Sequence, residues 1–139
     1  MTWHIFYNSS DKSIAWTANS GVNDSVIARE TDAGLSHLTI EQDDFVDASS
    51  SIVNEDGNGI VTKSTFNPTI STLTPALEST VNITGLPAGT KVYIDQVLKA
   101  TMSDTALNLT FNDPGFFNLK FQKPDHFDYE QVITVGRYA

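Results

Sequence analysis

Alternation of apolar and polar residues between positions 80 and 136 constrains this chain more than any other feature. A period of two is that of strands with one buried face. Turn residues separate the runs, for example at 85–89 and 112–115. The stretch therefore predicts a compact antiparallel β-domain. The alternating apolar residues are Val81, Ile83, Val92, Ile94, Leu107, Leu109, Phe111, Phe117, Leu119, Phe121, Val132 and Val135.

Residues 1–64 predict a smaller, hairpin-rich β-segment. Strand-forming residues over 3–7 and 13–17 flank a polar turn, which indicates a hairpin with aromatic side chains on both faces. Asn23 then offers an N-cap for a short helix, and Gly34 stands where that helix would end.

A strand and a second hairpin are expected after this helix. The alternation over 36–41 predicts a strand with Leu38 and Ile40 pointing inward. The segment 51–62 then has strand-like ends and an Asp-Gly pair at its centre, which is a strong hairpin signal.

The segment 65–75 is expected to be an extended linker. It holds two prolines, many hydroxyl side chains and no charge, so it is poorly suited to a helix. The predicted organisation is all-β: an acidic, hairpin-rich attachment segment over 1–64, the linker, and a β-domain over 76–139.

The charge of the chain is uneven and excludes several classes of partner. The net charge is −9; residues 1–62 hold ten acidic residues against two basic ones, and residues 63–139 hold seven against six. Binding to nucleic acid or to an anionic membrane surface needs clustered lysine and arginine, so neither partner is expected. The absence of cysteine excludes disulfides, thiolate zinc sites and cysteine nucleophiles.

The first residues have neither the basic start nor the apolar core of a signal peptide, and no apolar run approaches the length of a membrane span. The expectation is a protein that is made and kept in a cytosol, or leaves it by lysis or assembly.

Metal chemistry has two weak candidates in the acidic half. Residues 54–59 place oxygen side chains and a glycine as a calcium loop would, but the twelfth position is Thr65 instead of a bidentate glutamate. A hairpin turn is the favoured interpretation. A loose calcium site built from Asp43, Asp44 and Asp47 stays open as an alternative.

No residue pattern predicts catalysis. His4, His37 and His126 lack the spacing of a metal pair. Asp43 and Asp44 have the chemistry of a general acid and base, but nothing beside them supplies a nucleophile or a glycine cradle. We therefore predict a protein that is not an enzyme, with no catalytic, cofactor-binding or metal-binding residue.

Aromatic side chains near the N-terminus exceed what a two-stranded hairpin buries by itself. One interpretation packs them against Leu35, Leu38 and Ile40 of the same segment. The other places some of them in a protein interface, where tryptophan and tyrosine are favoured anchors. The candidate interface residues are Trp3, Phe6, Tyr7 and Trp16. The strand over residues 3–8 is expected to lie at a sheet edge, where it can pair with a neighbouring subunit.

Two motifs in the C-terminal part resemble the PEGA and related immunoglobulin-like β-sandwich modules. Residues 85–95 are similar to the family's P-x-G-x-x-V-Y-I-D-G strand, and 114–126 are similar to its pair of closing strands. Gln96 stands where the family has a turn glycine, and Asp125-His126 replaces a second Gly-Tyr. The resemblance implies an immunoglobulin-like β-sandwich over 76–139 and no catalytic residue.

The order of segments is also similar to that of small structural proteins of tailed bacteriophages. The likeness is carried by Phe6-Tyr7-Asn8 with Ile14, and by residues 52–63. It implies a virion protein that is assembled in the host cytoplasm, docks through 1–64 and displays the sandwich as a capsid decoration or a tail or fibre accessory. The implied partners are other virion proteins, further copies of this chain, and a weakly bound host-surface glycan.

Two other functions remain open from the sequence. A tail-fibre or tail-tip assembly chaperone would act in the cytosol and be absent from the particle, with its acidic half shielding a partner. A bacterial adhesion module is the third interpretation.

Overall fold

The computed structural model describes residues 1–137, and the chain divides into two compact units, residues 1–64 and 65–139. Within residues 1–137, all strands pair antiparallel and there is one short helix, which confirms the all-β prediction. Each unit has its own hydrophobic core.

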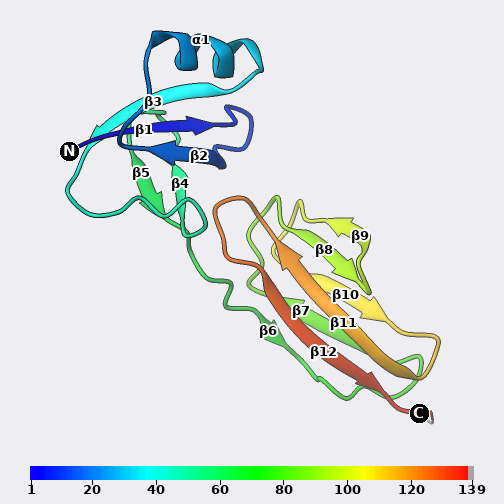
Figure 1. The fold of residues 1–139 in the computed structure, drawn as a ribbon. Coiled ribbons are helices and arrows are strands. Elements are labelled where there is room, and N and C mark those ends of the chain that lie inside the picture. Colours follow the sequence, from blue (N-terminus) through cyan, green and yellow to red (C-terminus); the bar gives the residue numbers. More distant parts are fainter. Residues whose placement is uncertain (138–139) are drawn as a thin grey trace. The chain divides into compact units, whose positions relative to one another are not determined.

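The first unit is built on a three-stranded antiparallel sheet (Figure 1). Its strands are β1 (Thr2–Tyr7), β2 (Ile14–Ala18) and β3 (Ser36–Glu41), in the order β2-β1-β3. β1 is therefore the central strand, and the expectation that it offers a free edge is wrong. β1 pairs with β2 along one edge and with β3 along the other, where Ile5 lies opposite Leu38.

The predicted helix is confirmed as α1 (Asp24–Asp32), which connects β2 to β3. The side chain of Asn23 accepts a hydrogen bond from the backbone N–H of Val26 at 3.0 Å, as an N-cap does. Gly34 follows the helix with a φ of 101°, a conformation that suits glycine.

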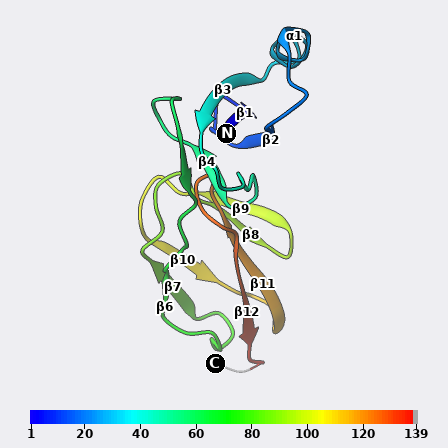
Figure 2. The ribbon, with the colours of Figure 1, turned by 60° about the vertical axis from the view of Figure 1, so that its left-hand side comes forward.

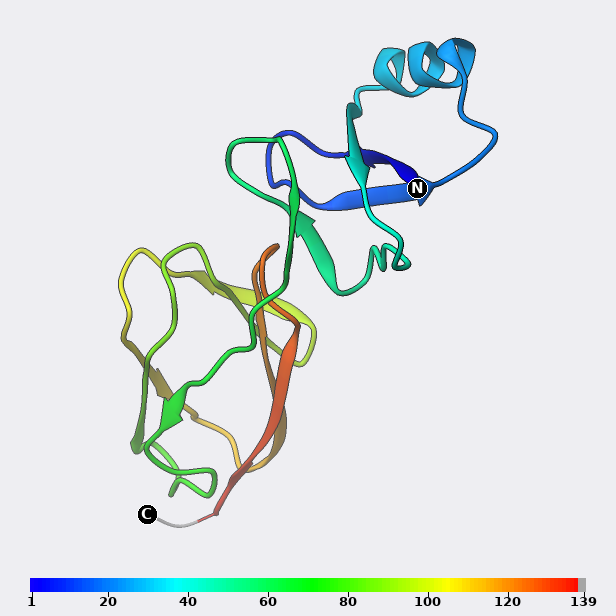
Figure 3. The ribbon, with the colours of Figure 1, turned by 90° about the vertical axis from the view of Figure 1, so that its left-hand side faces the viewer.

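A short hairpin covers one face of the sheet. Its strands are β4 (Ser51–Val53) and β5 (Ile60–Thr62), joined by the predicted turn around Gly57, whose φ is 73°. Figures 1 and 3 show this hairpin and α1 on opposite sides of the three-stranded sheet. The core between sheet and hairpin consists of Trp3, Ile5, Tyr7, Val46 and Val53, with Ile14, Leu38, Ile40 and Ile60 packed against it.

The second unit is a sandwich of two antiparallel sheets, which Figure 2 shows as separate layers. One sheet has the order β10-β7-β6 and is built from β6 (Thr69–Ile70), β7 (Thr80–Thr84) and β10 (Leu107–Thr110). The other has the order β12-β11-β8-β9 and is built from β8 (Lys91–Ile94), β9 (Val97–Thr101), β11 (Gly115–Gln122) and β12 (Tyr129–Val135). Seven strands in this arrangement form an immunoglobulin-like sandwich.

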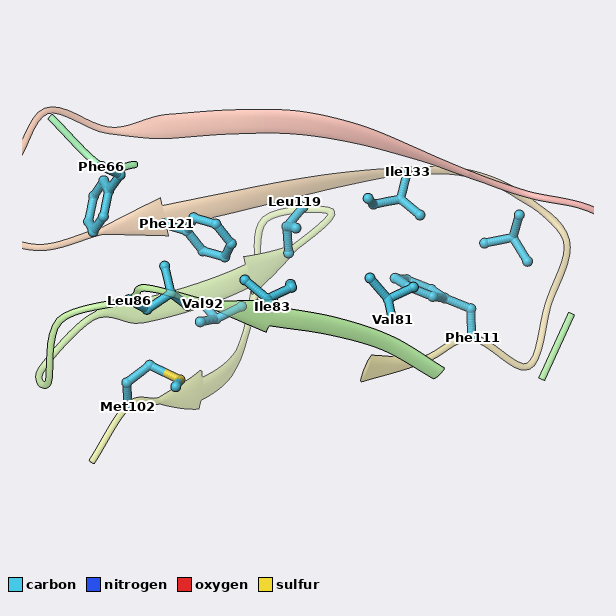
Figure 4. Packing of buried hydrophobic residues seen from close by; sticks show 11 residues of the cluster. Phe66, Val81, Ile83, Leu86, Val92, Met102, Phe111, Leu119, Phe121 and Ile133 are labelled. Carbon is cyan, nitrogen blue, oxygen red and sulfur yellow. The ribbon is translucent and has the colours of Figure 1, made fainter. Parts of the chain in front are cut away.

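The sandwich core follows the alternation in the sequence (Figure 4). Val81 and Ile83 of β7 face Leu119 and Phe121 of β11, and all four are fully buried. In the last strand one residue expected to point inward, Val132, is half exposed. Its neighbour Ile133 is buried instead, together with Val135.

Residues 65–75 are the first part of the sandwich, so the expectation of a linker is wrong. Phe66 is buried in the core, and Ile70 pairs with Ile83 of β7. Two carbonyls of the same segment, those of Leu73 and Pro75, accept hydrogen bonds from backbone N–H groups at the end of β12. A short strand beside prolines is typical of a sheet edge, which explains why this segment was not recognised as a strand.

A tight turn without glycine joins β8 to β9. Asp95 and Gln96 have φ values of 50° and 69°, so both adopt the left-handed conformation that two-residue hairpin turns require. The carboxylate of Asp95 accepts a hydrogen bond from the backbone N–H of Asn118 at 2.8 Å, and this contact fixes the turn against β11.

Candidate interaction surface

Three of the four candidate interface residues are covered by the first unit itself. Trp3, Phe6 and Tyr7 are 6%, 0% and 7% exposed, and only Trp16 is partly accessible. Trp3 and Tyr7 pack in the core with Leu38 and Ile40, which favours the interpretation that they belong to the same unit. An interface role stays a prediction for Trp16 alone.

Phe6 lies on the opposite face of the sheet, in an aromatic stack. Its ring is 4.3 Å from the ring of Trp16 and 4.9 Å from that of His37. Nδ1 of His4 lies 2.9 Å from Nε2 of His37, so the two imidazoles share a hydrogen bond. Burial, and then the charge of His4, lower the pKa of His37. Sequence spacing missed this pair, because antiparallel pairing of β1 with β3 brings the two residues together from 33 positions apart.

The most exposed aromatic side chain of the first unit is Phe45, which was not among the predicted site residues. Phe45 is 74% exposed, and its ring meets that of Trp3 edge to face at 5.7 Å. The indole N–H of Trp3 is buried and has no hydrogen-bond partner in the described part of the chain. The only sequence signal was a phenylalanine in an acidic loop, Asp-Asp-Phe-Val-Asp.

Phe45 forms one wall of a shallow groove beside β5. The groove has a volume of about 350 Å³. Val61 of β5, which is 50% exposed, contributes a second apolar side chain to it. We call this the β5 groove, and its lining residues are Gln42, Phe45, Val46, Asp47, Ser50, Ser51, Ile60, Val61 and Thr62.

The outer edge of β5 is unpaired in the described residues. β5 pairs only with β4, and the hydrogen bonds of this hairpin include those from Lys63 N–H to the Ser50 carbonyl and from Asn54 N–H to the Gly59 carbonyl. In an antiparallel pair, every second residue of a strand forms backbone hydrogen bonds with the neighbouring strand. In β5 the residue that bonds to β4 is therefore Val61, which lies opposite Ile52. The N–H and C=O groups of Ile60 and Thr62 therefore point away from β4.

Acidic residues lie in the loop that borders the β5 groove. Asp43 lies 3.5 Å from the N-terminal ammonium group, Asp44 follows it, and Asp47 lines the groove. A hydrogen bond from the Ser49 hydroxyl, with others from Ser49 and Ser50, lowers the pKa of Asp47, which therefore stays ionised well below neutral pH.

The calcium-loop interpretation gains no support from the geometry. Asn54 and Asn58 satisfy each other inside the turn: the Asn54 amide donates to the Asn58 side chain at 2.8 Å, and Asn58 N–H donates back at 3.1 Å. Within residues 1–137, no three imidazole or carboxylate side chains are grouped so that they could hold a metal ion.

The second unit has a small pocket at the end of the sandwich where β7 meets β8. Phe66 forms its floor, and the ring of His126 lies 4.6 Å from that of Phe66. Burial acts to raise the pKa of Asp125, but hydrogen bonds from Lys123 and His126 outweigh it, so the net shift is downward. Asp125 thus orients the imidazole of His126.

Exposed apolar side chains also occur on the sandwich, but they are dispersed. Phe116 is 77% exposed on β11, and Val97 and Leu98 are about half exposed on the edge strand β9. The pockets next to these side chains are separate from one another. By contrast, the β5 groove combines apolar side chains, free backbone groups and charge in one place.

No family model, curated protein or solved structure matches this chain. Among the helices that the structure describes, none has the length and apolar character needed to cross a membrane.

Proposed function

We propose that this chain is a non-enzymatic structural protein of a tailed-phage particle, which docks through residues 1–64 and displays the sandwich. The observation that carries the docking step is the β5 groove. Its Phe45 is 74% exposed next to a strand edge with free backbone groups. Aromatic side chains of this exposure are favoured anchors in protein interfaces. The virion assignment itself rests on the sequence resemblance.

The two units suit a division between attachment and display. The first unit holds ten acidic residues against three basic ones, a net charge of −7, whereas the second holds seven against five, a net charge of −2. The strongly charged unit with the exposed groove is the one that we assign to docking. The sandwich is the displayed part, because immunoglobulin-like sandwiches carry binding loops at their ends.

The test is to locate the chain in purified particles. Antibodies raised against the whole chain are applied with gold label to phage particles in the electron microscope. Label on heads would identify a decoration protein, and label on tails would identify a fibre or tip component. Particles without label, from a lysate rich in the protein, would overturn the proposal.

The acidic first unit also favours a second candidate, an assembly chaperone. A net charge of −7 beside an apolar groove suits a protein that shields a basic, sticky partner until assembly. This function predicts a complex in infected-cell lysate that disappears as particles mature. The same labelling experiment separates it from the structural role, since a chaperone is absent from the particle.

A further inference from the structure

We propose that the β5 groove binds an extended, basic segment of a partner protein, which pairs with the free edge of β5. In this complex the segment places an apolar side chain against Phe45 and Val61 and lysine or arginine side chains near the acidic residues. The inference rests on the proposed function, because it names the chemistry of the partner to which the first unit docks.

The backbone of β5 supplies the first step of the argument. Ile60 and Thr62 each direct one N–H and one C=O away from β4, and no described strand pairs with them. Such an edge is a template for a further strand, since a new strand satisfies these groups without rearrangement. An extended segment therefore fits this edge, whereas a helix would leave the four groups to water.

The apolar side chains supply the second step. Phe45 and Val61 are 74% and 50% exposed and both line the groove of about 350 Å³. Side chains of a paired strand alternate between its two faces, so every second residue of the segment would meet this wall. One apolar residue at such a position would cover both Phe45 and Val61.

The charge around the groove supplies the third step and sets the class of partner. Asp47 lines the groove, and Asp43 and Asp44 precede Phe45 in the same loop. The N-terminal ammonium group pairs with Glu41 at 3.7 Å and with Asp43 at 3.5 Å, and no ion pair among the described residues involves Asp44 or Asp47. A basic segment is complementary to this field, and an acidic one is repelled by it.

The same charge argues against a second copy of this chain as the occupant. A symmetric contact through the β5 groove would bring the acidic loops of two chains together, because a two-fold interface uses the same patch twice. Like charges placed together in an interface repel each other and disfavour the complex. The partner is therefore a different, basic protein.

Trp3 provides a direct signal for occupancy. Its ring contacts Phe45 edge to face at 5.7 Å, and its buried indole N–H has no acceptor in the described chain. A ligand that covers or shifts Phe45 changes the surroundings of this indole. Replacing the other tryptophan by Trp16→Phe leaves Trp3 as the sole tryptophan, so its fluorescence reports on the groove.

The experiment titrates the full chain carrying Trp16→Phe with a short blocked peptide in which valine alternates with lysine. Trp3 fluorescence gives the affinity, and amide NMR shifts of ¹⁵N-labelled protein give the location. We expect saturable binding that weakens with added salt, with the largest shifts at Ile60 and Thr62. A matched peptide with glutamate in place of lysine should not bind, and N-methylation of the lysine peptide's backbone should abolish its binding.

Two variants and one control assign the contact. Phe45→Ala and Thr62→Pro should each weaken binding by at least about fivefold, the first through loss of the anchor and the second through loss of an outward N–H. Phe116→Ala is the matched control, because Phe116 is as exposed as Phe45 (77% against 74%) but lies in the other unit. It should leave the affinity unchanged.

The inference is overturned by no binding of the lysine peptide, by equal binding of the glutamate peptide, by shifts away from β5, or by an equal effect of Phe116→Ala. Self-association of the chain that Phe45→Ala abolishes would also overturn it, in favour of a second copy. Failure of the proposed function gives a different result, namely particles that lack the chain although the peptide binds at β5.

Discussion

The two units reach stability by different means. The sandwich closes two sheets over a cluster of eleven buried apolar residues, whereas the core of the first unit has five, among them Trp3 and Tyr7. A unit of this size buries a smaller share of its surface than a larger domain does, so a few large side chains matter more to its stability. The comparison teaches that the sandwich has the larger core, while the first unit has the smaller core and leaves Phe45 exposed beside the unpaired edge of β5.

The largest expected effect tests whether the two cores are independent. Phe121 is fully buried and its ring lies 5.4 Å from that of Tyr129, so Phe121→Ala should destabilise the sandwich by about 3–5 kcal/mol. Both tryptophans lie in the first unit, so their fluorescence reports that unit alone. In a urea titration, the unfolding transition of the sandwich, followed by circular dichroism, should move to lower urea concentration. The transition followed by tryptophan fluorescence should stay in place. A tryptophan transition that moves equally would show that the units unfold together.

The next effect tests where the sandwich begins. Phe66 lies at the start of the second unit and is 8% exposed, with its ring 6.1 Å from that of Phe121. Phe66→Ala should cost about 3 kcal/mol of sandwich stability, measured by the same titration. Leu73→Ala, at a 40% exposed position of the same segment, is the control and should cost much less. If residues 65–75 were a flexible linker, both substitutions would be neutral.

A smaller effect compares two turns, one in each unit. Gln96 holds a φ of 69° without being glycine, so Gln96→Gly should stabilise the sandwich by about 1 kcal/mol. Gly57 has a φ of 73° in the first unit, and a Cβ there would lie 3.2 Å from the Tyr7 hydroxyl, so Gly57→Ala should destabilise. Thermal unfolding of the two variants should thus shift in opposite directions. A loss of stability in Gln96→Gly would mean that its side chain contributes more than its backbone conformation costs.

The smallest expected effect is a difference between the two units in how their stability depends on pH. Burial lowers the pKa of His37 from its ordinary value of 6.5, so below that pH the unfolded state binds more protons than the folded state. The first unit should therefore lose stability as pH falls through 6.5 toward the lowered pKa. In the sandwich the pKa of Asp125 is below 3.8, so its contribution is lost only in stronger acid. Urea titrations at pH 7 and pH 5 measure this loss of stability, and His37→Gln should make it smaller. If the stability of the His37→Gln variant depends on pH as strongly as that of the original chain, the prediction is contradicted.

The sequence predicted the sandwich well because its strands bury one face each. Alternation identified the inward residues of β7, β8 and β11, and turn residues marked their ends. It did not identify β9, whose Val97 and Leu98 are both exposed and so show no period. Nor did it identify β6, because a two-residue edge strand is defined by its pairing with β7 and leaves little local pattern.

The candidate surface was harder to predict than the fold. Aromatic content drew attention to Trp3, Phe6 and Tyr7, but the core beneath the β4–β5 hairpin buries Trp3 and Tyr7, and Phe6 is buried in the stack on the other face of the sheet. Phe45 became conspicuous only through its exposure, which depends on how the loop after β3 folds over Trp3. The His4–His37 contact likewise depends on strand register, which spacing along the chain does not reveal.

The hydrogen bonds that tie residues 73–75 to β12 have a mechanical consequence. The chain enters the sandwich at one end, before β6, and leaves it at the other end, after β12 (Figures 1 and 3). A pulling force between these ends acts along both segments, so the bonds from Thr134 to Leu73 and from Gly136 to Pro75 bear load in shear and break together. Forced unfolding is governed by the unfolding rate, and a shared load slows it. A sandwich held at one end and pulled at the other is therefore built to resist tension.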